Sequence, residues 1–189
     1  MAGLKEDVNA IKKDYPEKVV GVIGGSSVSS ETEKFSESLG YRLRQEIEFL
    51  SYGYIMTGGV GGVGEAVHEG ISRYVKEHPG ALRRDFAVLP HGSGNGRVVP
   101  ISALGNDMYE RRKGIPLVAA VVCSVSGGEG TAHEIQATLD AKTPLVLFDG
   151  TGGATQSAIS RFQARKERNV EIARSLDEGA EFVKKYVGR

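Results

Sequence analysis

The sequence predicts an α/β fold of the doubly wound type, a mostly parallel sheet with helices on both faces. Two observations support this prediction. Short apolar runs alternate along the chain with longer amphipathic segments, and a glycine cluster follows most of the apolar runs. Parallel strands need crossover connections, which are usually helices, so a strand–loop–helix alternation is typical of such a sheet.

The predicted strands are apolar runs without polar alternation, which is typical of strands buried on both faces. In chain order they are Val19–Ile23, Tyr54–Met56, Phe86–Leu89, Leu117–Val125 and Pro144–Phe148, with a further short strand at Val170–Ala173. The predicted helices place apolar residues at three- and four-residue steps. They are Glu31–Leu50, Gly64–Val75, Ala132–Ala141 and a last helix for which Ser175 is the expected N-cap. Residues 1–17 are an N-terminal extension, and Pro90–Arg97 is a loop.

The chain has 189 residues, of which 40% are hydrophobic, so we expect one nucleotide-binding domain spanning residues 1–189. Lys+Arg and Asp+Glu both number 24. This balance lacks the basic excess of a nucleic-acid or membrane surface, so neither partner is expected. Residues 1–15 mix charges and contain no apolar segment, so we expect no signal peptide and a cytoplasmic location. The single cysteine, Cys123, excludes a disulfide within the monomer.

Glycine occurs 26 times, and its placement predicts a phosphate or nucleotide site. The clusters follow predicted strands, where ligands bind in open α/β sheets. Glycine lets backbone N–H groups approach an anion, and a following helix N-terminus adds its own N–H groups. The candidate binding residues are Gly24, Gly25, Ser26, Thr57, Gly58, Gly59, Gly61, Gly127, Gly128, Gly130 and Thr131. The hydroxyls of Ser26, Thr57 and Thr131 are expected to donate to the phosphate, although a tight turn alone explains any single cluster.

Several familiar sites are absent from the sequence. No Gly-x-Gly-x-x-Gly follows the first strand and no Gly-Lys-Ser/Thr occurs, which disfavours a classical NAD enzyme and a P-loop NTPase. The four histidines, His68, His78, His91 and His133, do not pair at metal-ligand spacing, so no metal site is expected. His91, in the glycine-rich loop, is either a contact to a base or an ordinary surface histidine.

Two segments resemble a known family. Gly127–Glu134 (Gly-Gly-Glu-Gly-Thr-Ala-His-Glu) is similar to the Pro-Gly-Gly-x-Gly-Thr-x-x-Glu motif of the LONELY GUY-like proteins, once described as lysine decarboxylases. Met108–Arg112 is similar to their Met-x-x-Arg-Lys motif. Val22–Ser26 also resembles the opening of the molybdenum cofactor carriers, which share the fold. The resemblance covers about Val19 to Asp149 and implies a modified Rossmann fold and a homodimer or larger homo-oligomer.

The resemblance implies an activity as well. Members with both motifs hydrolyse the N-glycosidic bond of nucleoside 5′-monophosphates, and the matching catalytic residues here are Arg111 and Glu134, with Arg112 as the alternative arginine. A carboxylate beside the ribose would stabilise oxocarbenium character or activate water. Glu134 also suits an ordinary helix start, and Arg111 an ordinary charged surface. The chain departs from the motif at Ser126, where the family has proline, and at Glu129, an acid inside the phosphate loop.

Three functions therefore compete. The first is a phosphoribohydrolase acting on a purine nucleoside 5′-monophosphate, which needs no cofactor. The second is a carrier of molybdenum cofactor or a related phosphate-bearing pterin. The third is a sensor of nucleotide-derived signals, an interpretation that rests on the fold alone. The Arg111 and Glu134 pair favours the hydrolase, while the Val22–Ser26 opening and Ser126 favour the carrier.

Overall fold

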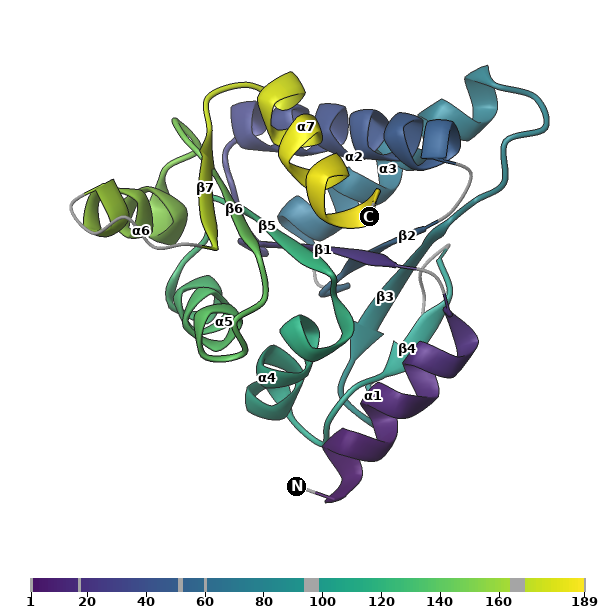
Figure 1. Cartoon of the computed structure of the whole chain (residues 1–189), viewed down its shortest axis with the longest axis vertical. Coiled ribbons are helices and arrows are strands. Elements are labelled where there is room, and N and C mark those ends of the chain that lie inside the picture. Colours follow the sequence, from purple (N-terminus) through teal and green to yellow (C-terminus); the bar gives the residue numbers. More distant parts are fainter. Residues whose placement is uncertain are drawn as a thin grey trace.

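The computed structural model confirms the predicted class: a seven-stranded parallel sheet with the order β4-β3-β2-β1-β5-β6-β7 and helices on both faces (Figure 1). The structure describes residues 2–16, 18–50, 53–59, 61–93, 99–163 and 169–188. Every neighbouring pair of strands is parallel. The strands are β1 (Val19–Gly24), β2 (Tyr54–Thr57), β3 (Asp85–Leu89), β4 (Ile101–Ala103), β5 (Val121–Val125), β6 (Leu145–Phe148) and β7 (Val170–Ala173).

Strand alternation divides the apolar side chains between two cores. In β1, Val19 and Ile23 point to one face of the sheet, and Val20 and Val22 point to the other. The helices of the first face are α1 (Ala2–Asp14), α4 (Met108–Val118), α5 (Glu129–Asp140) and α6 (Gly153–Gln163). Those of the second face are α2 (Ser30–Leu50), α3 (Gly62–Glu77) and α7 (Leu176–Val187).

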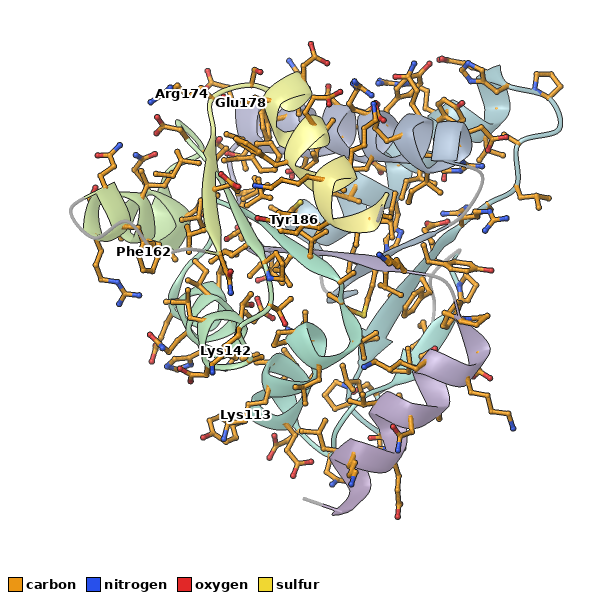
Figure 2. All side chains as sticks on the ribbon, in the orientation of Figure 1. Lys113, Lys142, Phe162, Arg174, Glu178 and Tyr186 are labelled. Carbon is orange, nitrogen blue, oxygen red and sulfur yellow. The ribbon has the colours of Figure 1, made fainter. Side chains whose placement is uncertain are left out.

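Figure 2 shows side chains filling the space between each helix layer and the sheet. Phe162 of α6 belongs to the first core, and Tyr186 of α7 packs against the second. Both faces of the central strands are therefore buried, which explains why these strands read as continuous apolar runs. No helix in the described part of the chain is long and apolar enough to cross a membrane.

The direction of chain winding reverses at β1, because β2 lies on one side of it and β5 on the other. Loops that leave the carboxyl ends of strands on the two sides of such a switch point diverge and open a crevice between them. The glycine clusters after β1, β2 and β5 all lie at this edge. The topology therefore brings three segments that are far apart in sequence to one place.

Some predicted elements differ from the structure. The predicted strand Leu117–Val125 contains the end of helix α4, which runs to Val118, and the strand begins only at Val121. An apolar run does not by itself separate a buried helix end from a buried strand. The N-terminal extension contains α1, and neither β4 nor α6 was predicted. The predicted loop Pro90–Arg97 lies partly outside the described residues.

Helix α4 was not predicted either, although its start carries a local signal. The Asp107 carboxylate accepts a hydrogen bond from the backbone N–H of Glu110 at 2.8 Å, and the Glu110 carboxylate accepts one from the N–H of Asn106 at 2.9 Å. This reciprocal arrangement is close to a capping box. The Asp-Met-Tyr-Glu sequence would have located the helix that carries Met108 and both arginines.

Candidate functional site

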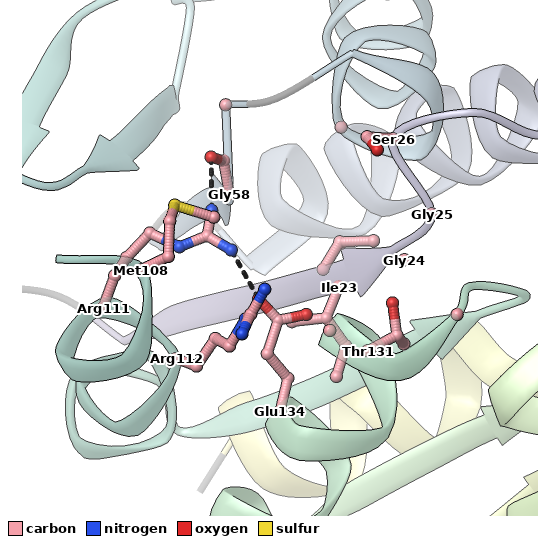
Figure 3. Close-up of a pocket in the computed structure, with 15 residues that line it drawn as sticks. Ile23, Gly24, Gly25, Ser26, Gly58, Met108, Arg111, Arg112, Thr131 and Glu134 are labelled. Carbon is pink, nitrogen blue, oxygen red and sulfur yellow. Dashed lines mark hydrogen bonds and ion pairs between the residues drawn. The ribbon is translucent and has the colours of Figure 1, made fainter. Parts of the chain in front are cut away.

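A cavity of about 230 Å³ lies at the carboxyl edge of the sheet, where β1, β2 and β5 end (Figure 3). Its walls come from the loops after these strands and from helices α3, α4 and α5. The lining residues are Val22, Ile23, Gly24, Gly25, Ser26, Gly58, Gly59, Gly64, Met108, Arg111, Arg112, Gly128, Gly130, Thr131 and Glu134. Both candidate catalytic residues and eight of the eleven predicted binding residues thus line one cavity. Its position at the carboxyl edge of the sheet agrees with the prediction from the glycine clusters.

One wall of the cavity is a glycine cradle made by the Gly24–Ser26 loop and the first turn of α5. A side chain at Gly24 has no room, since a Cβ there would lie 2.5 Å from the carbonyl oxygen of Val125. Helix α5 begins after Gly128, an N-cap residue that has no side chain to accept from the first N–H groups. Unpaired N–H groups at a helix N-terminus favour an anion such as phosphate.

Two residues near this wall, Glu129 and Ser126, are the positions where the sequence departs from the family motif. Glu129, the acid inside the motif, is exposed and is not among the residues that line the cavity. Its carboxylate therefore does not line the cradle. Ser126, which replaces the family's proline, adopts a positive φ of 54°, and its backbone N–H donates to the hydroxyl of Thr151 at 3.0 Å. That hydrogen bond restrains the backbone before α5 at the position where the family motif has proline.

A buried ion pair between α4 and α5 also lines the cavity. Arg111 is 5% exposed and Glu134 is 4% exposed. The Nη2 atom of Arg111 donates to Oε1 of Glu134 at 2.7 Å, and its Nη1 atom donates to the carbonyl oxygen of Gly58 at 2.6 Å (Figure 3). The guanidinium thus joins the loop after β2 to helix α5.

Burial shapes the charge state of this pair. Desolvation raises the pKa of Glu134, although the neighbouring guanidinium groups of Arg111 and Arg112 act in the opposite direction. Desolvation likewise lowers the pKa of Arg111, against the attraction of Glu134. Both shifts mean that the folded protein holds these charges at a cost. A perturbed acidic group in a cleft is characteristic of functional sites.

Arg112 also lines the cavity and lies beside Glu134 (Figure 3). A Cβ on Gly130 would lie 2.9 Å from its Nη2 atom, so its guanidinium lies against the first turn of α5. Its Nε atom is buried and has no hydrogen-bond partner among the described residues. The two adjacent arginines are therefore placed differently: Arg111 is held by Gly58 and Glu134, and Arg112 faces the glycine cradle.

Three predicted binding residues lie outside the cavity lining: Thr57, Gly61 and Gly127. Gly61 and Gly127 have positive φ values of 40° and 91° and shape the turns before α3 and α5. The hydroxyl of Thr57 differs from its predicted role as a phosphate donor, because it bonds to Nε2 of His68 at 2.7 Å. Its side chain points into the protein, towards α3.

Sequence reasoning missed two contributors. Met108 lines the cavity, and His68 of α3 supports the loop after β2 through Thr57. No spacing rule pairs Thr57 with His68, since only the packing of α3 on the sheet brings them together. His91 contacts Asp7 of α1 and does not line the cavity. No cluster of three potential metal ligands occurs within the described ranges.

A cavity lined by glycine loops at the switch point of a parallel sheet defines a Rossmann-like protein with a nucleotide-binding type of site. The chain belongs to the SLOG cluster4 family, whose model matches residues 17–179. This result confirms the predicted membership of the wider LONELY GUY-like superfamily. Comparison with curated proteins gives no significant match.

Solved structures share the fold over nearly the whole chain. TM1055 is 26% identical with a TM-score of 0.72, and the match covers 89% of this chain and 99% of that one. The molybdenum cofactor carrier protein from Chlamydomonas reinhardtii is 23% identical with a TM-score of 0.73, covering 92% and 99%. The DNA processing protein A from Helicobacter pylori, described for its single-stranded DNA binding mode, is 13% identical with a TM-score of 0.62, covering 92% and 83%.

Proposed function

We propose that this protein is a phosphoribohydrolase that cleaves the N-glycosidic bond of a purine nucleoside 5′-monophosphate. The observation that carries the proposal is the buried Arg111–Glu134 pair in the wall of a cavity that also holds a glycine cradle. The cradle suits the 5′-phosphate, and Glu134 lies one turn further along α5 in the same cavity. The cavity thus contains both a glycine cradle suited to an anion and the carboxylate of Glu134.

The reaction needs no further group. As the bond between C1′ and the base nitrogen breaks, positive charge develops on the ribose, and the Glu134 carboxylate stabilises it. Water then forms the new C1′–O bond, its proton passes to Glu134 and from there to the departing base, and the carboxylate is restored. The products are the free base and ribose 5-phosphate. Arg111 keeps Glu134 ionised and oriented, because its guanidinium donates directly to Oε1 at 2.7 Å.

The test is incubation of the purified protein with AMP, GMP and an N6-substituted AMP, with base and ribose 5-phosphate followed by chromatography. Glu134→Ala is the paired variant. We expect equal amounts of base and ribose 5-phosphate with the wild type and neither with the variant. Absence of release from every nucleotide tried would rule out the hydrolase.

A carrier of a phosphate-bearing pterin is the second candidate. It is supported by the whole-chain likeness to the Chlamydomonas reinhardtii molybdenum cofactor carrier and by the cradle, which suits any terminal phosphate. In this function the cofactor is cargo, and the protein breaks no bond. A raised melting temperature with a pterin phosphate, together with no base release, would favour the carrier.

A further inference from the structure

A buried polar chain leads away from the cavity, starting at Thr57 at the end of β2. The Thr57 hydroxyl lies 2.7 Å from Nε2 of His68, and Nδ1 of His68 lies 2.6 Å from Oδ2 of Asp85. Arg83 then donates to both carboxylate oxygens of Asp85, at 2.7 and 3.0 Å. The three inner residues are almost fully buried: Thr57 is 1% exposed, Asp85 3% and His68 6%.

The Asp85 carboxylate fixes the direction of the hydrogen bonds that it makes. Burial raises the pKa of Asp85, but the hydrogen bonds from His68 and Arg83 outweigh it and hold the pKa below its usual value. The ionised carboxylate only accepts, so Nδ1 of His68 carries the hydrogen that it donates. Nε2 on the other side of the ring is hydrogen-bonded to the Thr57 hydroxyl. The Thr57 oxygen in turn accepts the backbone N–H of Gly59 at 3.2 Å.

This series of hydrogen bonds ends at the loop after β2, which contacts Arg111. Gly58 lies between Thr57 and Gly59, and its carbonyl oxygen accepts from Nη1 of Arg111 at 2.6 Å. The contact is close, since a Cβ on Gly58 would lie 2.4 Å from Nη1. A shift of the loop would therefore move the guanidinium and, through it, the Glu134 carboxylate.

We propose that Asp85, His68 and Thr57 are positioning residues that fix the Gly58 carbonyl and thereby orient Arg111 towards Glu134. The effect on catalysis rests on the proposed function, but the orientation of Arg111 does not. The triad has the order of a nucleophile, a base and an acid. Thr57 is nevertheless 1% exposed and does not line the cavity, so its hydroxyl has no access to a substrate there.

The test compares Thr57→Val, which removes the hydroxyl with little change of shape, with Thr57→Ser, which keeps it. Ser36→Ala is the matched control, because the Ser36 hydroxyl is also fully buried and bonds to the carbonyl oxygen of Thr32 within α2. For base release from AMP we expect Thr57→Val to lower kcat on the order of 10- to 100-fold with KM changed less than about threefold. Thr57→Ser should restore most of kcat, and Ser36→Ala should leave it unchanged. Equal kcat for Thr57→Val and Thr57→Ser would overturn the proposal.

A second readout does not depend on turnover. NMR of the wild type should show a hydrogen on Nδ1 of His68 and slowly exchanging guanidinium hydrogens on Arg111. Thr57→Val should speed the exchange of those hydrogens about tenfold or more, while Thr57→Ser should not. A His68 without a hydrogen on Nδ1, or unchanged exchange in Thr57→Val, overturns the proposal even if the protein cleaves no nucleotide. If Thr57→Val does not fold, the exchange of the Arg111 guanidinium hydrogens is measured in His68→Gln instead. Unchanged exchange in that variant overturns the proposal.

Discussion

Two threonines in similar surroundings have opposite orientations. Thr57 follows the apolar run of β2 and Thr131 follows that of β5, each beside glycines and each just before or within the start of a helix. Thr131 lines the cavity at the first turn of α5, and Figure 3 shows its hydroxyl rising towards the Gly24–Ser26 loop. Thr57 points the other way and bonds to His68.

The difference follows from the element to which each residue belongs. Thr57 is the last residue of β2, and strand alternation sends its side chain to the same face as Ile55, where α3 packs. Thr131 lies on a helix whose side chains lean towards its N-terminus, which is the cradle. One threonine therefore lines the cavity and the other is hydrogen-bonded within the fold, and the sequence motif alone does not distinguish them.

The largest expected effect on turnover comes from replacing the glycine next to each threonine by alanine. In Gly58→Ala the new Cβ would meet Nη1 of Arg111 at 2.4 Å, and the buried guanidinium cannot move without losing its contact with the Gly58 carbonyl. We expect kcat for base release to fall about 100-fold or more. In Gly130→Ala the Cβ meets Arg112 instead, at 2.9 Å, so the loss should appear mainly in KM for AMP. Steady-state kinetics of both variants test the contrast, and the opposite split would contradict it.

The second prediction exchanges each threonine for valine and measures binding in place of turnover. Thr131→Val should weaken the binding of AMP about tenfold, because the cavity loses a donor to the phosphate. Thr57→Val should leave AMP affinity nearly unchanged but lower the free energy of unfolding by about 1–3 kcal/mol, since His68 and Gly59 lose a buried partner. Isothermal titration and urea unfolding of both variants provide the check. Similar losses of AMP affinity in the two variants would contradict the different roles assigned to the two threonines.

The third prediction concerns the pH dependence of turnover. Desolvation raises the pKa of Glu134, and the ionised form is the one that stabilises the oxocarbenium charge. The rate constant kcat/KM should therefore increase as the pH rises through a pKa above the usual range of glutamate. A pH–rate profile measures this limb. An identical limb in a Glu134→Gln variant with residual activity would show that another group titrates.

The smallest expected effect is on the pH dependence of stability, through the buried carboxylate of Asp85. Hydrogen bonds from His68 and Arg83 hold the pKa of Asp85 low in spite of its burial. A lowered pKa contributes stability above the unfolded pKa, and this contribution is lost as the pH falls through the folded pKa. Acid unfolding of Asp85→Asn should therefore show a shallower dependence on pH than the wild type. An unchanged dependence would mean that the carboxylate is not held as described.

Much of the architecture was predictable because parallel strands buried on both faces leave a clear apolar signal, as in Val19–Ile23 and Pro144–Phe148. The glycine loops followed from strand ends, and eight of the predicted binding residues line the cavity. The apolar run Leu117–Val125 misled because a helix end and a strand are equally hydrophobic there. Side-chain direction was harder still, since the pairing of Thr57 with His68 depends on how α3 packs on the sheet.

The most direct measurement is to compare AMP binding and AMP cleavage in the wild type and in Glu134→Gln. Glutamine keeps an oxygen for the Arg111 guanidinium but removes the carboxylate charge. We expect the wild type to release base and ribose 5-phosphate in equal amounts. We expect Glu134→Gln to bind AMP with similar affinity and to lose at least about 100-fold in rate. Undiminished release by the variant, or no AMP binding by either protein, would contradict the account.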